Sequence, residues 1–406
     1  MTESRRDLPW VALLLAPLAL LPFGAAAELP LLLAALLGVV GVLRGRIDPG
    51  QPCLRLASLL FAAYWLPEFI SAFDSVAMRK SWTEVAADLR FLPFLWLAVQ
   101  ELGTARRIGL AMRAVALLLA IWCLDALLQA ATGWSLGGAS RADRLSGIFG
   151  DDNLKLGGVI ATLAPFGMLA AWQRWRARGA LLAFVPILAV VLLAGARAAW
   201  IVLLVATALL LWRQLGARRG ALAMGACVLL GLGAGIVADA LSPRFAERVE
   251  RTVTAFAGQP DALDHALAGR VPIFRTALVM SAAHPFNGVG VRAFRHAYPD
   301  FAAPGDPWVD PASRQGAAHA HHWLLEVLSE TGAVGLSCWL AGIALAWRAL
   351  RSATPAQREP AAPAGLALVA TLFPLNTHYA VYSSFWAVLL FVLLALWLAA
   401  LRSASR

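Results

Sequence analysis

Apolar residues fill the chain in long runs that polar segments interrupt. A helix needs about 20 mainly apolar residues to cross a bilayer, and twelve runs suggest such helices. They are Leu8–Phe23, Leu29–Leu43, 54–72, 90–100, 108–131, 154–172, 180–196, 198–212, 221–241, 332–350, 362–377 and 382–401. The stretch 180–212 is too long for one crossing, and Gly195-Ala-Arg197 breaks it into two spans that meet at a tight turn. The pattern predicts an all-α polytopic membrane protein with about 12 transmembrane helices.

The first run has two interpretations. It follows Arg5-Arg6 and ends at Gly24-Ala-Ala-Ala27, as a signal peptide with a small-residue cleavage site would. A second apolar run begins at once, however, which favours a retained helical hairpin.

Arginine marks one side of the predicted bundle. When loops are assigned alternately, every short loop on the N-terminal side is basic. These arginines are Arg5, Arg6, Arg44, Arg46, Arg55, Arg106, Arg107, Arg174, Arg176, Arg178, Arg213, Arg218, Arg219, Arg348, Arg351, Arg358, Arg402 and Arg406. Cytoplasmic loops carry such an excess, so we expect both termini in the cytoplasm. The outer side then receives 72–89, 132–153, the turn at 197, 242–331 and 378–381.

Composition excludes other classes. Of the 406 residues 60% are hydrophobic and only 14% charged, and the mean hydropathy is +0.70. A soluble globule, a disordered chain and a disulfide scaffold are therefore ruled out. The net charge of +10 comes almost wholly from arginine, since Lys80 and Lys155 are the only lysines. The basic cytoplasmic loops explain part of this arginine excess, and binding of an anionic lipid or phosphate would explain the rest. We expect no nucleic-acid partner. The four cysteines are scattered, three of them within apolar runs.

The long outer segment divides the chain into residues 1–241 with spans one to nine, 242–331 as a catalytic segment, and 332–406 with spans ten to twelve. All seven histidines lie on the outer side. Residues 244–256 have the pattern of an amphipathic helix that lies in the headgroup plane or packs on the protein's own loops. Residues 269–283 read as a helix that stops at His284-Pro285.

Two further features of this segment carry chemistry. Phe286-Asn-Gly-Val-Gly-Val-Arg-Ala-Phe294 is a glycine-rich turn without the GxGxxG pattern of a nucleotide-binding loop. His319-Ala-His321-His322 opens a helix that runs to Glu330 and ends at Thr331-Gly332. His322, Glu326 and Glu330 share one helical face, so the acids can orient an imidazole.

The histidine cluster has competing explanations. Three histidines in four residues suggest zinc, but no Cys, HExxH or DxD motif accompanies them. A surface cluster without a role is the plain alternative. Its position at the mouth of a membrane helix, opposite arginines, favours a functional role.

An ordered series of motifs resembles bacterial O-antigen ligases and O-antigen polymerases. Gly269-Arg270…Phe274-Arg275…His284-Pro-Phe-Asn-Gly-Val-Gly-Val-Arg-Ala-Phe294 is similar to their "GR…W…HPxxGxGxxxF" stretch. His321-His322-Trp-Leu-Leu325…Leu328-Ser-Glu330-Thr-Gly332 resembles "HNxxLxxLxETG", with His322 where the family usually has Asn. Arg197 fits the arginine after the paired helices, and Gly147-Ile-Phe-Gly-Asp-Asp-Asn153 resembles "GxFxxxN". The series covers roughly residues 140–340.

The resemblance implies a GT-C-like glycosyltransferase of the bacterial inner membrane, active on the periplasmic face without metal or cofactor. The donor would be undecaprenyl-pyrophosphate-linked O-polysaccharide, and the acceptor a sugar hydroxyl of lipid A–core. By register with Glu330 and Gly332, the resemblance assigns the catalytic base to His321. By motif match, Arg197 and Arg270 hold the diphosphate, because arginine gives phosphate planar bidentate contacts.

Other residues are second choices for the site. Arg270 and Arg275 are five positions apart, about 500° on a helix, so the two point in different directions. The second choices are Arg275, Arg292, Arg90, Lys80, His319, His322 and Glu330.

Three alternatives remain open for the activity: an O-antigen polymerase, a protein-glycosylating ligase of the same superfamily, and a transporter or flippase of lipid-linked oligosaccharide. A transporter predicts internal repeats and midplane charges. No repeat is visible, and the runs hold only Glu68, Asp125 and Asp239 as acids of note. We interpret Asp125 as a buried helix–helix polar contact, and expect Glu68 to meet Lys80 or Arg90 at the cavity rim.

Overall fold

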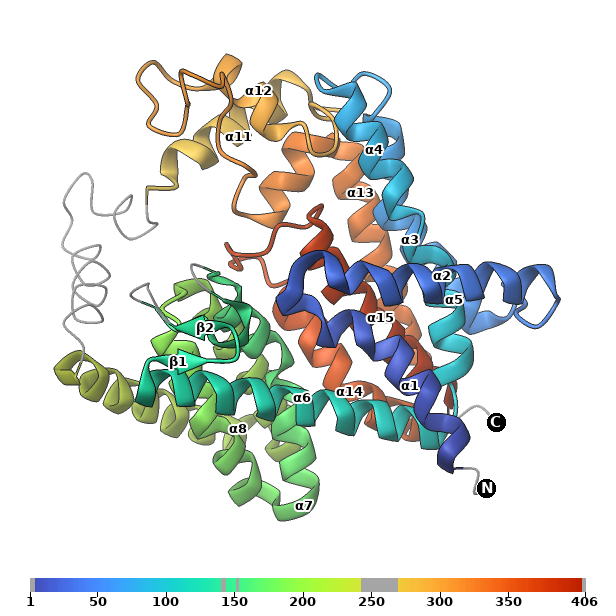
Figure 1. Ribbon diagram of the computed structural model, residues 1–406, viewed down its shortest axis with the longest axis vertical. Coiled ribbons are helices and arrows are strands. Elements are labelled where there is room, and N and C mark those ends of the chain that lie inside the picture. The colour runs from blue at the N-terminus through green and yellow to red at the C-terminus, as the bar shows by residue number, and fades with distance from the viewer. Residues whose placement is uncertain (1–3, 140–143, 151–152, 242–268, 404–406) are drawn as a thin grey trace.

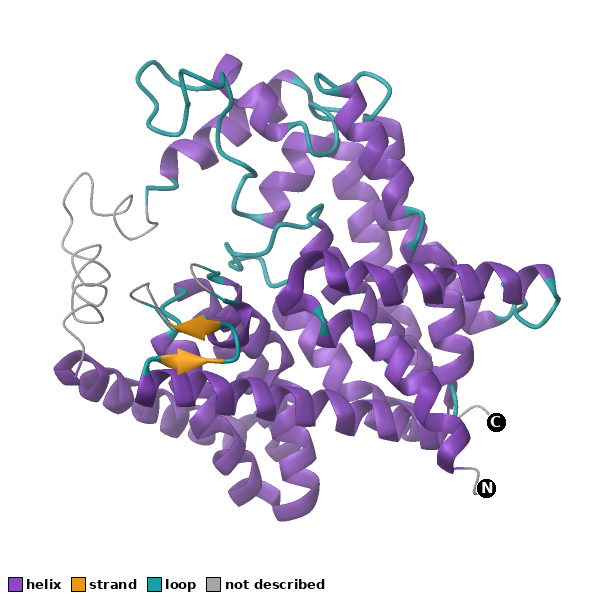
Figure 2. Cartoon of the chain, viewed as in Figure 1, coloured by secondary structure: helices purple, strands orange, loops and turns teal. Residues whose placement is uncertain are grey.

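The computed structural model describes residues 4–139, 144–150, 153–241 and 269–403, and nearly all of this chain is helical (Figures 1 and 2). The helices are α1 (Ser4–Ala19), η1 (Leu21–Ala27), α2 (Glu28–Leu43), α3 (Pro52–Ser71), α4 (Met78–Asp88), α5 (Phe91–Leu102), α6 (Ala105–Thr132), η2 (Gly147–Phe149), α7 (Lys155–Leu193), α8 (Arg197–Leu241), α11 (Val271–Ala283), α12 (Phe294–Phe301), α13 (Trp323–Ser352), α14 (Pro355–Thr371) and α15 (Ser384–Ser403). A two-stranded antiparallel hairpin follows α6, formed by β1 (Trp134–Ser135) and β2 (Gly138–Ala139).

Seven helical segments within the described chain are long and apolar enough to cross a membrane. They are Leu21–Leu43, Pro52–Ser71, Ala105–Thr132, Lys155–Leu193, Arg197–Ile236, Trp323–Ser352 and Ser384–Ser403. Many of their large apolar side chains face outward, such as Leu43 at 80% and Leu124 at 70% exposure. Because water would disfavour so much exposed apolar surface, the chain is a multi-pass membrane protein. The all-α class is confirmed, and the number of twelve crossings stays a prediction.

Two of these helices are bent where the sequence predicts turns between spans. The backbone of α7 leaves helical geometry at Trp175 and Arg176, and that of α8 does so at Gly216. Between the two helices, Gly195 has a φ of +67° and α8 restarts at Arg197. The predicted tight turn at Gly195-Ala-Arg197 is therefore confirmed.

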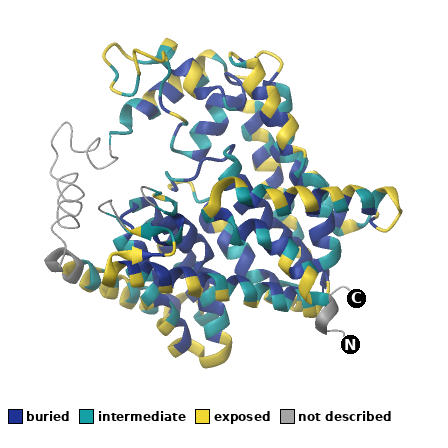
Figure 3. Cartoon of the chain, in the orientation of Figure 1, coloured by how far each residue is buried: buried dark blue, intermediate teal, exposed yellow. Residues whose placement is uncertain are grey.

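Helix α15 forms the centre of the molecule. It packs against α14, α5, α6 and α3, and nearly all of its residues are buried (Figure 3). Helix α15 also contacts α1, and the two chain ends lie on the same side of the molecule (Figure 1).

The predicted run 362–377 is wrong at its end, because α14 stops at Thr371. Pro374 lacks an N–H group and disfavours helical geometry at Phe373. The Asn376 side chain also donates to the Thr371 carbonyl at 2.9 Å. Residues 372–383 thus form a non-helical segment much longer than the expected loop 378–381.

The region that contains α11 (Val271–Ala283) and α12 (Phe294–Phe301) lies opposite the chain ends (Figure 1) and has its own small core. Ile273 and Met280 of α11 pack against Phe294 and Tyr298 of α12. The predicted helix 269–283, ending at His284, is confirmed by α11. The predicted amphipathic helix 244–256 and His265 lie outside the described residues, as does the side chain of Asp239. Helices α4 and α12 and the hairpin were not expected.

Candidate functional site

The site is built around a break near the N-terminal end of α13. Gly332 interrupts this helix with a φ of +64°, and the glycine turn 286–293 lies against the break. A Cβ on Gly332 would come within 2.2 Å of the Phe286 carbonyl oxygen, and one on Gly288 within 2.4 Å of the Glu330 backbone. Only glycine allows this approach, so these glycines fix the turn on the helix.

Two buried glutamates of α13 hold neighbouring loops. The Glu330 carboxylate accepts the backbone N–H of Arg292 at 2.7 Å and that of Phe294 at 3.3 Å. The Glu326 carboxylate accepts the N–H of Val381 at 3.2 Å and that of Tyr382 at 3.4 Å. The idea that they orient the His322 imidazole is therefore wrong. The carboxylates satisfy backbone donors that burial would otherwise leave without partners.

The histidines lie just before α13, with His322 at its N-cap. The rings of His319 and His321 are 3.9 Å apart, and the His322 ring meets Phe274 edge-on. His321 has a φ of +50°, a conformation that costs a non-glycine residue energy and often marks functional sites. Its Nδ1 is buried without a hydrogen-bond partner among the described residues.

Arg270 lies beside these histidines as the N-cap of α11. Its Nη1 donates to the carbonyl and the hydroxyl oxygen of Thr377, each at 3.2 Å. Burial lowers the pKa of Arg270, and the positive charges of Arg197 and Arg144 lower it further. Positive charges are therefore gathered here. Their repulsion raises the free energy of the ligand-free protein, and an anionic ligand would lower it.

Four cations, which we call the cationic cluster, and three histidines interact electrostatically in this region. The cationic cluster comprises Arg144, Lys155, Arg197 and Arg270. Burial lowers the pKa of His319 to about 3, of His321 to about 2 and of His378 to about 4, and neighbouring arginines and imidazoles contribute. All three imidazoles are thus neutral at physiological pH. Across the described residues, no three His, Cys, Asp or Glu side chains form a metal-binding group.

Three of the second choices have other surroundings. Arg275 is exposed, in line with the expected divergence from Arg270. Lys80 pairs with Glu84 at 3.5 Å. Arg90 pairs with Glu28 and Asp88, each at 2.9 Å.

Arg292 faces acids instead of the cationic cluster. Burial alone would lower its pKa, but the carboxylates of Glu330, Glu84 and Glu326 outweigh burial and raise it. Glu68 is fully buried, and its carboxylate oxygens have no hydrogen-bond partner in the described part of the chain. The expected contact of Glu68 with Lys80 or Arg90 is therefore not seen.

The loop that carries Arg144 is fixed by the end of α6. Gln129 Oε1 accepts the N–H groups of Ser146 and Gly147 at 3.0 and 2.8 Å, and Asp125 Oδ1 accepts that of Leu136 at 2.7 Å. Asp125 therefore makes a buried polar contact, though with a loop and not with another helix.

Sequence reasoning missed Arg144, Lys155, Thr377 and His378. His378 is one of the seven histidines predicted on the outer side. The pattern of apolar runs, however, does not predict that His378 lies near His321. Lys155 was visible as one of two lysines, and it lies over the Phe385 ring at 4.2 Å.

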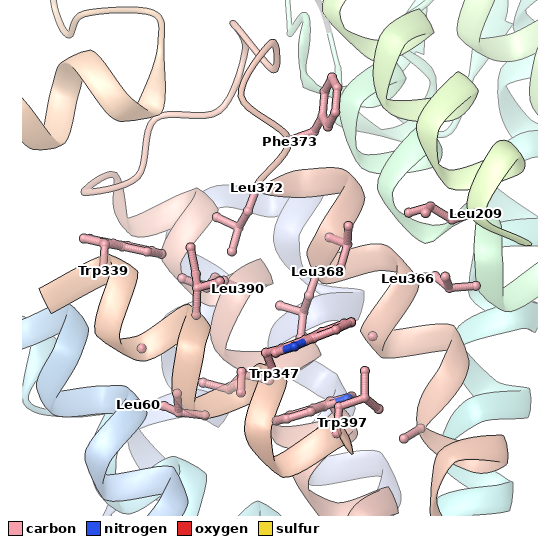
Figure 4. A pocket seen from close by; sticks show the side chains of 18 of the residues that line it. Leu60, Leu209, Trp339, Trp347, Leu366, Leu368, Leu372, Phe373, Leu390 and Trp397 are labelled. Atoms are coloured by element: carbon pink, nitrogen blue, oxygen red, sulfur yellow. The ribbon is translucent and has the colours of Figure 1, made fainter. Parts of the chain in front are cut away.

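A large apolar crevice opens between α13, α14, α15, α3 and α8 (Figure 4). Its volume is about 540 Å³, and Trp339, Trp347 and Trp397 line it. Phe373 and Pro374, at the start of the segment 372–383, also line it. The crevice therefore extends to the segment 372–383, which also contains Thr377, the hydrogen-bond partner of Arg270.

The fold and the site define a polytopic helical membrane protein in which four cationic side chains lie near three buried histidines. Residues 181–340 match the model of a family described as O-antigen ligase. This match supports the resemblance to O-antigen ligases that the motifs in this segment show. The match indicates a glycosyltransferase-like activity of ligase or polymerase type. Comparison with curated proteins gave no match.

Proposed function

We propose that the protein is an O-antigen ligase of the bacterial inner membrane. It transfers O-polysaccharide from undecaprenyl pyrophosphate to a sugar hydroxyl of lipid A–core on the periplasmic face. The observation that carries this proposal is the cationic cluster beside His321 at the outer end of α13. A diphosphate is an anionic group of the kind that clustered guanidinium groups bind.

Arg197 and Arg270 hold the donor diphosphate. A guanidinium keeps its charge beside a membrane and binds two phosphate oxygens at once. These contacts also stabilise the charge that develops on the diphosphate as it leaves. In the ligand-free protein Arg270 lies among other cations, so diphosphate binding relieves their repulsion.

His321 accepts the proton of the acceptor hydroxyl. A bond forms between the acceptor oxygen and the anomeric carbon of the donor, and the bond from that carbon to the diphosphate oxygen breaks. The proton moves to His321, and undecaprenyl diphosphate leaves. Burial and the neighbouring imidazole and arginine hold the pKa of His321 low. The bound diphosphate offsets these positive charges and raises the pKa toward the range in which a base is effective.

The apolar crevice suits the lipid chain of the donor. It lies among membrane-spanning helices, and the segment that bounds its end at Phe373 also carries Thr377 beside Arg270. A polyprenyl chain can therefore lie among apolar side chains while its diphosphate reaches the cationic cluster. Trp347 lines the crevice and is 59% exposed. A substitution of this side chain can therefore test whether the crevice binds the lipid chain.

Deletion of the gene tests the proposal. For a ligase, a lipopolysaccharide gel shows loss of the ladder while lipid-linked polymer accumulates. Lipid A–core bearing a single repeat would mean a polymerase instead. An unchanged ladder would contradict both activities. Lipid-linked intermediate trapped on the cytoplasmic face would contradict both and favour a transporter.

A further inference from the structure

The segment 372–383 lies beyond the range matched by the family model, yet it reaches the site. At its start, the Asn376 side chain donates to the Thr371 carbonyl and accepts the N–H of His378 at 3.2 Å. At its end, Tyr379, Ala380, Val381 and Tyr382 are all buried. The segment therefore has a fixed path between α14 and α15.

Helix α13 and helix α3 secure the end of this path. The Glu326 carboxylate accepts two of its N–H groups, and the Tyr64 hydroxyl donates to the Val381 carbonyl at 3.3 Å. The hydroxyl groups of Tyr382 and Thr331 lie 2.9 Å apart. Because Glu326 is fully buried, the energy of these hydrogen bonds is not weakened by water.

Helix α7 contacts the middle of the segment. A Cβ on Gly158 would lie 3.3 Å from His378 Cδ2 and 3.2 Å from Trp386 Cη2. The His378 ring also packs edge-on against Trp386. The glycine thus lets the segment approach the helix that begins with Lys155.

Thr377, between these fixed points, contacts the guanidinium of Arg270. Both of its oxygens accept from the same nitrogen, Nη1. A guanidinium also carries donors on Nε and Nη2. Fixing Nη1 therefore sets the plane of the guanidinium and the direction in which its other donors point.

We propose that Thr377 is a positioning residue, which orients Arg270 for the donor diphosphate, and that Glu326 fixes the segment from which Thr377 acts. This proposal rests on the proposed function for the identity of the donor. Thr377 itself does not contact the reacting atoms. Its effect on transfer passes through Arg270.

Thr377→Val tests this role because it removes the hydroxyl acceptor while keeping the shape of the side chain. We expect kcat/KM for the lipid-linked donor to fall about three- to tenfold, the effect of one hydrogen bond. Thr377→Ser keeps the hydroxyl and should restore transfer. The matched control is Thr371→Val, since the Thr371 hydroxyl bonds to Thr162 and Ala367 instead of Arg270.

A double-mutant cycle shows whether Thr377 acts through Arg270. In the Arg270→Lys background, Thr377→Val should cause no further loss. An equal loss in both backgrounds, or wild-type kcat/KM in Thr377→Val, would overturn the proposal. If Thr377→Val does not accumulate as folded protein, Glu326→Gln replaces it in the same cycle, with the same expected non-additivity.

Binding of farnesyl diphosphate to the purified protein separates this proposal from the proposed function. We expect Arg270→Lys and Thr377→Val each to weaken binding, with no added effect in the double variant. This result in a protein that transfers no polysaccharide would refute the ligase function and keep the role of Thr377. Normal binding by Thr377→Val, together with Arg270-dependent binding, would refute the role of Thr377 alone.

Discussion

A buried imidazole among positive charges stays neutral, and a base must be neutral to accept a proton. His321 meets this condition because burial and its neighbours His319, Arg270 and His378 all disfavour its charged form. Its φ of +50° fixes the ring at a cost that the surrounding contacts must offset. At the scale of single residues, these surroundings keep the His321 imidazole in its neutral form.

Removing this imidazole should abolish most of the transfer. We expect His321→Ala to lower transfer by about two to four decades while the amount of folded protein in the membrane stays normal. His319→Ala and His322→Ala should have milder effects, and exposed His296→Ala serves as the control. Full activity of His321→Ala at normal expression would remove His321 from the mechanism, and a larger effect at His319 or His322 would reassign the base.

Substitution of arginine by lysine distinguishes a phosphate clamp from a charge that only reaches the membrane surface. Lysine keeps the charge but loses the bidentate contact. We expect Arg197→Lys and Arg270→Lys to lower transfer about ten- to hundredfold, whereas exposed Arg275→Lys stays near wild type. In-membrane transfer at matched expression is the measurement. Near-normal transfer by both variants would exclude the clamp.

The low pKa of His378 also links stability to pH. In the unfolded chain a histidine has a pKa of about 6.5, while burial lowers that of native His378 to about 4. Between these values the unfolded state binds more protons, so the contribution of His378 to stability falls as the pH falls. Burial raises the pKa of Asp88 to about 7, which acts in the opposite direction. The contribution of His378 to stability must therefore be measured by comparing wild type with a variant that lacks this histidine.

We expect His378→Gln to gain thermal stability relative to wild type as the pH falls from about 7 to 5, because glutamine takes up no proton. The measurement is the Tm of both detergent-solubilised proteins at constant ionic strength. A Tm difference that does not depend on pH would be inconsistent with a neutral buried His378.

Motifs in the sequence identified Arg197, Arg270 and His321, which the structure brings near one another. Sequence reasoning did not identify Arg144 or Thr377. Their contacts join residues more than a hundred positions apart, and such pairing depends on how the helices pack. No local pattern carries that information.

At the scale of elements, the break in α13 determines the shape of the site. The Gly332 backbone has a positive φ, and a side chain there would collide with the glycine turn. We expect Gly332→Ala to reduce the amount of folded protein or lower its Tm by several degrees, since such strain costs about 1–3 kcal/mol. Gly225→Ala is the control, because a Cβ at Gly225 meets nothing within 4 Å. Equal Tm values for the two variants would show that the break tolerates a side chain.

Long helices could be predicted more accurately than short ones. The turn at Gly195 and the bends in α7 and α8 follow from arginine or glycine between apolar runs. The end of α14 was missed although Pro374 marks it, because Leu372 to Leu375 continue the apolar composition. Helices α4 and α12 and the hairpin are short, and their stability comes mainly from tertiary contacts.

At the scale of the whole molecule, charged side chains from distant parts of the chain meet near the N-terminal end of α13. Arg270 of the cationic cluster interacts with the histidines, and Arg292, which interacts with Glu330, Glu84 and Glu326, also interacts with His319.

The arginine excess in short loops and the number of twelve crossings remain predictions about topology. In the described chain, α1 and α15 contact each other. Apolar patterns predict that a helix crosses the membrane, but they do not determine how the outer segments fold over the bundle.

Transfer by the purified protein tests the central claim most directly. Wild-type protein in lipid nanodiscs is incubated with undecaprenyl-pyrophosphate-linked O-polysaccharide and lipid A–core. We expect conjugated lipopolysaccharide and free undecaprenyl diphosphate to form in equal amounts, and an Arg270→Lys, His321→Ala double variant to form neither at a measurable rate. No conjugate from folded wild-type protein, or equal conjugation by the double variant, would contradict the account.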